Sequence, residues 1–260
     1  MTTSFDFRTR KFRQRFKKFS FVFVLIFLIV FVLVVFNVAD LFSSAITNKG
    51  SILYGEKIRI SNTIYYGVSL YNSTTLEKSE QQAQNILKQG GAGFVYCMGE
   101  YYVLGSIYSS HEDATEVKEK LDLDGVETKI ININIPVINI NYKGDKTKEN
   151  TEIFSVFKTV FDSLYNLSIE FDMGSKTVQE LKKDINKISN DFSIKINDFD
   201  AIFKKEKYDF QKQIIEHLNR IKASLDPILT YDGVNLTLNG KIKNVCCEIV
   251  VEYYNLAKVI

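Results

Sequence analysis

The sequence contains few residues of the types that usually carry metal or nucleophilic chemistry: two histidines, three cysteines and no tryptophan. Three cysteines in 260 residues cannot form a disulfide framework, and they show no Cys-x-x-Cys spacing. The two histidines, His111 and His217, are far apart in the chain, are too few for a zinc enzyme, and are expected at solvated helix positions. Gly-x-Ser-x-Gly is also absent. We therefore expect no catalytic residues, no metal, no cofactor and no enzyme activity.

Charge is unevenly distributed along the chain, although the formal total is only +2. Residues 1–18 carry seven basic side chains against Asp6, a balance of +6, so the rest of the chain sums to −4. A composition that is 45% apolar and 25% charged excludes a disordered or collagen-like protein. The acidic balance beyond residue 18 argues against nucleic acid as a partner.

Residues 21–36 form an uninterrupted apolar run, and residues 19–39 are long enough as a helix to cross the ~30 Å hydrocarbon core of a bilayer. This pattern predicts an uncleaved transmembrane helix, because the run is longer than that of a signal peptide. The basic cluster precedes it, which favours a cytoplasmic N-terminus. We expect a single-pass membrane protein, with a linker at 40–62 and the remainder outside the cytoplasm.

The segment 63–142 contains an internal repeat. The pair Tyr65-Tyr66 recurs as Tyr101-Tyr102, and each copy reads as a strand, a helix with one apolar face and a second strand. Gly90 and Gly125 lie where the two helices must end. The predicted fold class is α+β, with β-α-β-β-α-β order, both helices on one face of an antiparallel sheet and the other face open.

This order and the run Tyr101-Tyr-Val-Leu-Gly-Ser-Ile-Tyr-Ser-Ser-His-Glu-Asp-Ala114 resemble the SPOR (sporulation-related repeat) family. The resemblance covers residues 63–135. It implies a protein of a bacterial cell membrane with a ferredoxin-like domain that binds peptidoglycan glycan strands lacking stem peptides, in cell division or sporulation.

Tyrosine rings and hydroxyl groups are the side chains that could cover and hydrogen-bond a sugar polymer. Strict alternation places the aliphatic residues of the first strand, together with Tyr66, under the helices, and it places Tyr65, Ser69 and Tyr71 on the open face. The predicted glycan-binding residues, with their counterparts in the second copy, are Tyr65, Ser69, Tyr71, Tyr102, Ser106 and Tyr108. The alternative is that several of these tyrosines are packed at sheet edges.

Residues 150–260 change to helical periodicity, with apolar residues three and four apart. Met173-Gly174-Ser175 interrupts the pattern, Pro227 closes its second part, and residues 242–258 predict a last helix. This helical module is either a coiled coil or bundle that self-associates or binds a protein partner, or an intramolecular hairpin that packs on itself.

The sequence thus supports two functions. The first is non-catalytic binding of peptidoglycan by a membrane-anchored SPOR-like domain. The alternative is a membrane-anchored scaffold whose domain and helices bind other proteins.

Overall fold

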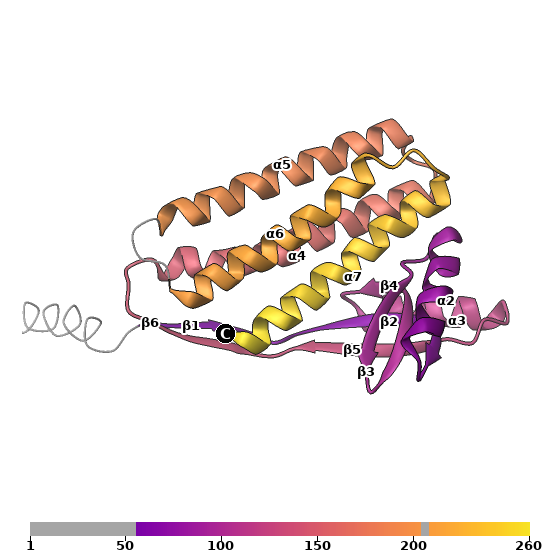
Figure 1. The fold of residues 1–260 in the computed structure, drawn as a ribbon, viewed down its shortest axis with the longest axis horizontal. Helices are drawn as coiled ribbons and strands as arrows, with labels where there is room; N and C mark the ends of the chain where they lie inside the picture. The colour runs from indigo at the N-terminus through magenta and orange to yellow at the C-terminus, as the bar shows by residue number, and fades with distance from the viewer. Residues whose placement is uncertain (1–55, 204–207) are drawn as a thin grey trace, which may run out of the picture. The chain divides into compact units, whose positions relative to one another are not determined.

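The computed structural model describes residues 56–203 and 208–260 (Figure 1). The basic tail (1–18), the predicted transmembrane helix (19–39) and most of the predicted linker (40–62) lie outside the described residues.

The expected fold class and localisation need a correction. Within residues 56–203 and 208–260, none of the helices combines the length and the apolar character needed to cross a bilayer. The long helices fail because each carries charged residues along one side. The described fold is therefore α+β without a membrane-spanning helix.

The repeat region folds in the predicted β-α-β-β-α-β order. Its four strands form one sheet in the order β3-β4-β2-β5, in which all neighbouring strands are antiparallel. This strand order is that of a ferredoxin-like domain. The elements are β2 (Thr63–Ser73), α2 (Leu76–Lys88), β3 (Phe94–Met98), β4 (Glu100–Tyr108), α3 (His111–Leu123) and β5 (Lys129–Ile135).

A two-stranded ribbon, which the sequence did not predict, extends this sheet (Figure 1). It pairs β1 (Glu56–Ile60), inside the segment expected to be linker, with β6 (Ile138–Tyr142). Alternation in β6 buries Ile138, Ile140 and Tyr142 and exposes the asparagines between them. The ribbon therefore adds one apolar side to the core.

Four helices follow and form a ring in which α4 and α6 each pack against α5 and α7 (Figure 1). Thr177 begins α5 with a capping box, because its hydroxyl accepts from the Glu180 amide and the Glu180 carboxylate accepts from the Thr177 amide. Gly174, at a φ of 70°, provides the left-handed residue that ends α4. The helices are α4 (Thr147–Asp172), α5 (Val178–Ile202), α6 (Asp209–Leu229) and α7 (Asn235–Val259).

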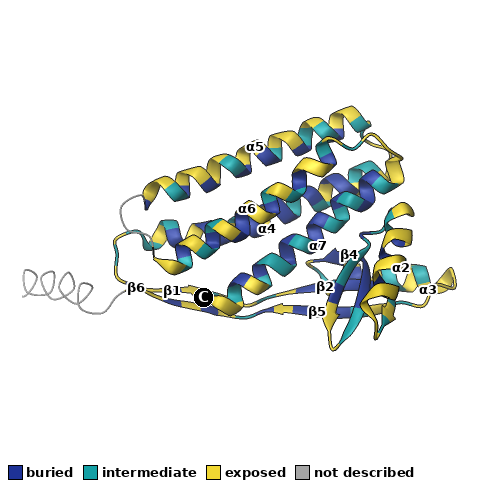
Figure 2. Ribbon diagram, viewed as in Figure 1, coloured by how far each residue is buried: buried dark blue, intermediate teal, exposed yellow. Residues whose placement is uncertain are grey.

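Both faces of the sheet are covered. Helices α2 and α3 lie on one face, as predicted, whereas α4 and α7 pack against the face that was expected to be open (Figure 2). That face carries Leu104, Ile107, Ile131 and Ile133, all buried, and leaving so much apolar surface in water would be unfavourable. Residues 57–260 consequently form one compact unit with a continuous core.

Candidate functional site

The six predicted glycan-binding residues do not form one surface. Tyr65 and Tyr102 belong to the core shared with the helical module, and Ser69 pairs in register with Leu104 on the same side. Tyr71 lies on the other face of the sheet, where it packs against residues of α2. Tyr108 packs against residues of α3 on that same face. Ser106 lies with Tyr108, to whose phenol oxygen its hydroxyl donates at 2.8 Å.

Irregular pairing between β2 and β4 causes this division. The register shifts on both sides of Ser69, and on β4 it passes from Leu104 to Ser106 without Gly105. Each such bulge reverses which face the following side chains occupy. Gly105 was the available sequence signal, because an isolated glycine within a strand pattern often marks a bulge. A Cβ at Gly105 would lie 2.6 Å from a methyl carbon of Leu70.

Three of the four tyrosines in this set offer no open ring surface for a sugar, and the fourth, Tyr71, is half-buried. Tyr65 is 2% exposed and its ring meets that of Phe161 edge-on at 5.0 Å. Tyr102 is 6% exposed and accepts from the Lys129 ammonium at 3.2 Å. Tyr108 is 8% exposed and contacts Tyr165 of α4. A polymer could reach Tyr65 only if α4 moved away.

Two tyrosines of the helical module, Tyr165 on α4 and Tyr253 on α7, predict a specific response to alkali. Burial raises the pKa of Tyr165 and of Tyr253 to about 12, from an ordinary value of 10.0. A folded-state pKa above the unfolded one stabilises the fold below pH 10, and this stabilisation is lost as pH rises toward 12. We expect phenolate absorbance to rise in two phases, the later one coinciding with loss of the helical circular dichroism signal. A single phase near pH 10 with intact dichroism would show that these tyrosines are exposed.

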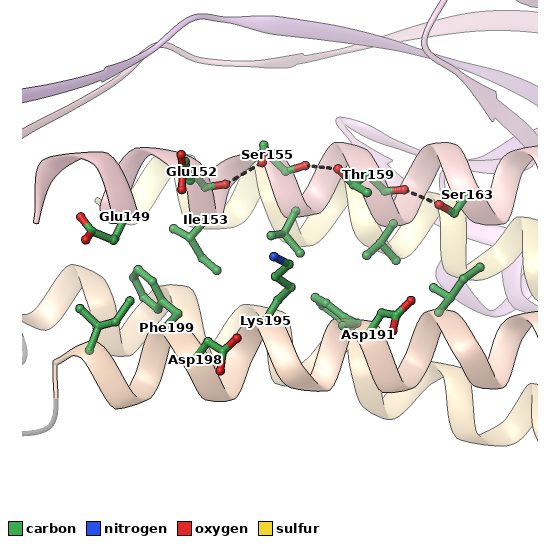
Figure 3. Close-up of a pocket in the computed structure, with 15 residues that line it drawn as sticks. Glu149, Glu152, Ile153, Ser155, Thr159, Ser163, Asp191, Lys195, Asp198 and Phe199 are labelled. Carbon is green, nitrogen blue, oxygen red and sulfur yellow. Dashed lines mark hydrogen bonds between the residues drawn. The ribbon is translucent and has the colours of Figure 1, made fainter.

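The helical module contains an open groove between α4 and α5 with a volume of about 630 Å³ (Figure 3). Its floor is apolar: Ile153, Phe192 and Phe199 are buried, and Ile188 is half-buried. Ile202, at one end, is 42% exposed. We call this hollow the α4–α5 groove.

The α4 wall of the groove is made of small side chains whose hydroxyls already have partners. Ser155 donates to the Glu152 carbonyl at 2.7 Å, Thr159 to the Ser155 carbonyl at 3.0 Å, and Ser163 to the Thr159 carbonyl at 2.8 Å (Figure 3). Because these groups are satisfied within the helix, another protein surface could cover them without leaving unpaired polar atoms.

The rim of the groove is acidic. Glu149 and Glu152 on α4 and Asp191 and Asp198 on α5 face one basic residue, Lys195, a balance of −3. Two of the acids have only distant partners, since the Lys146–Glu149 and Lys148–Glu152 pairs measure 3.8 and 3.6 Å. Asp191, Lys195 and Asp198 form no ion pair with another described residue. Asp191 and Asp198 are therefore available to a positively charged partner, and Glu149 and Glu152 are held only loosely by the lysines that they already have.

Two side chains with catalytic potential, those of His217 and Cys246, are buried in the helical module. His217 is 7% exposed, so the expectation of a solvated histidine is wrong; its Nδ1 lies 2.5 Å from the Glu252 carboxylate and links α6 to α7. His111 is exposed, as expected. Burial raises the pKa of the Cys246 thiol to about 12, which keeps it protonated. In the described part of the chain, no three His, Cys, Asp or Glu side chains are placed to hold a metal ion.

No family model, curated protein or solved structure matches this chain. The resemblance to the SPOR family consequently rests on the strand order and on residues 101–114.

Proposed function

We propose that this chain is a non-catalytic scaffold that binds another protein, and that the α4–α5 groove receives a helix of that partner. The observation that supports this function is the groove itself, an open hollow with an apolar floor on the surface of a well-packed helix ring. Concave, mainly apolar surfaces with a polar rim are typical of helix-in-groove recognition.

The dimensions of the groove suit a short helix. Its lining on α4 extends from Glu149 to Ser163, about 21 Å at a rise of roughly 1.5 Å per residue. A helix of about four turns would cover that length. Its apolar stripe would contact Val156 and Ile188, which are only half-buried in the free protein.

Binding of peptidoglycan glycan strands by the sheet is the competing proposal. The strand order supports it. The sheet tyrosines weigh against it, because Tyr65 and Tyr102 are part of the core beneath the helical module. Glycan binding would need that interface to open, at the cost of exposing the apolar residues around them.

Site-specific photo-crosslinking distinguishes the two functions. A photoreactive amino acid is placed at Thr159, in the groove, and as a matched control at Asn166, an exposed position of the same helix outside it. We expect a discrete adduct from position 159 only, in cells of the native host, with the crosslinked peptide mapping to an amphipathic helical segment. We also expect no co-sedimentation with purified sacculi stripped of stem peptides. Co-sedimentation without an adduct at 159 would replace the scaffold proposal with glycan binding.

A further inference from the structure

We infer that the helix held by the α4–α5 groove is basic, and that its positive residues lie at the end of the groove where α4 begins and α5 ends. This inference rests on the proposed helix-binding function. It adds the charge of the partner and the direction in which that charge is arranged.

The charges of the rim are not spread evenly. Glu149, Glu152 and Asp198 gather around Phe199 at one end, where none of the described lining residues is basic (Figure 3). From outside the lining, Lys146 and Lys148 pair with Glu149 and Glu152 at 3.8 and 3.6 Å. Further along the groove, the positive charge of Lys195 balances the negative charge of Asp191, and the Lys195 side chain reaches from α5 into the space between α4 and α5 (Figure 3). Among the described residues that line the groove, the excess of negative charge therefore lies at one end, and the remainder is nearly neutral.

This distribution of charge along the groove discriminates between partner helices that have the same apolar stripe but different charges. The floor provides contact area to any amphipathic helix, whereas the three carboxylates attract a basic one and repel an acidic one. Because these carboxylates are at or near the surface, each contact with a lysine or arginine is weak, and three together are expected to change affinity about tenfold at moderate salt.

A second copy of the chain is a less suitable occupant. In a symmetric dimer built on this groove, the same hollow would meet itself, and two hollows that face each other leave both apolar floors uncovered. A separate partner that offers a helix with basic residues fills the hollow and pairs with the carboxylates.

Two synthetic helical peptides of about sixteen residues test the inference against the full chain. They share one leucine stripe and differ only at three positions near one end, which are lysine in one peptide and glutamate in the other. Fluorescence anisotropy should show that the lysine peptide binds about tenfold more tightly, with a preference that declines as salt increases.

Charge variants locate the preference. In the triple variant Glu149→Gln, Glu152→Gln, Asp198→Asn we expect the two peptides to bind equally. A matched triple variant on α2, α3 and the loop after α3, Glu80→Gln, Glu119→Gln, Glu127→Gln, changes the same charge at exposed positions outside the groove and should keep the tenfold preference.

The possible failures are distinguishable. Equal binding of both peptides to the unmodified chain would overturn the basic-partner inference and leave the helix-binding function in place. Binding of neither peptide would overturn both. A preference that survives in the groove triple variant would place the charge recognition elsewhere. A concentration-dependent dimer that the lysine peptide disrupts would assign the groove to a second copy.

Discussion

Replacing Phe161 with alanine is expected to cost about 3–5 kcal/mol and to destabilise the sheet and the helices together. Phe161 is fully buried on α4, and its ring packs against Tyr65 of β2 and Tyr165 of its own helix. The substitution removes a large apolar side chain from the contact between the sheet and the helical module. Because that contact belongs to one continuous core, neither part should keep its stability.

Urea unfolding followed by far-ultraviolet circular dichroism measures the loss for the helices, and hydrogen exchange of the β4 amides measures it for the sheet. Both should report the same decrease in the free energy of unfolding. Domains of this kind are stable by only about 5–15 kcal/mol, so Phe161→Leu provides a milder variant in case alanine prevents folding. Asn166→Ala, at an exposed position on the same helix, is the control and should change stability by less than about 0.5 kcal/mol. A loss confined to one probe would mean that the sheet and the helices are independent domains.

Replacing Gly240 with alanine is expected to destabilise the protein by about 1–3 kcal/mol. This is the reverse of the usual effect, since alanine in a helix is normally more stabilising than glycine by about 0.5–1 kcal/mol. Gly240 lies in α7 where this helix crosses the end of α2. A Cβ there would be 2.6 Å from the Gly91 carbonyl oxygen and 2.8 Å from that of Leu87, and both contacts are to backbone. The backbone of α2 and its loop cannot rotate away as a flexible side chain could, so α7 itself must shift.

Chemical denaturation of Gly240→Ala and of the bulkier Gly240→Val measures this effect, with valine expected to be the worse of the two. Asn255→Ala, at an exposed position of α7, is the control for a simple change of helix propensity. The shift should also weaken the two bonds beside the crossing, from Lys243 to the Gly90 carbonyl and from Asn244 to the Ala92 carbonyl. A Gly240→Ala protein as stable as the original would show that α7 does not approach α2 this closely.

Local patterns in the sequence predicted the order of the elements well. The repeat of Tyr65-Tyr66 as Tyr101-Tyr102 revealed two strand-helix-strand units, and the helical spacing of apolar residues identified α4. One apolar series from Val178 to Pro227 became two helices, α5 and α6, and the last helix, expected at 242–258, begins earlier, at Asn235. Both signals depend on neighbours along the chain. Strand β1 was missed because a strand of five residues beside a polar segment has little pattern of its own.

Long-range packing could not be predicted from the same patterns. The spacing of Phe157 and Phe161 indicates a buried side of α4, but it does not say which surface buries that side. Strict alternation also assumed regular strands, and the bulges near Ser69 and Gly105 moved Tyr71 and Tyr108 to the opposite face. The sequence contains one weak indication of the groove. Small side chains, those of Ser155, Thr159 and Ser163, recur at every fourth position of α4, where long charged side chains are more usual on a helix surface.

The placement of α7 has a consequence for how the protein is synthesised. This helix contacts β3, β4 and β5 as well as α4 and α6, yet the ribosome makes it after every other described element. More than one hundred residues separate Ile135, the end of the sheet, from the final turns of α7. At about 5–20 residues per second, the sheet waits on the order of ten seconds with Ile131 and Ile133 uncovered. During that interval the nascent chain presents an apolar surface to which chaperones could bind.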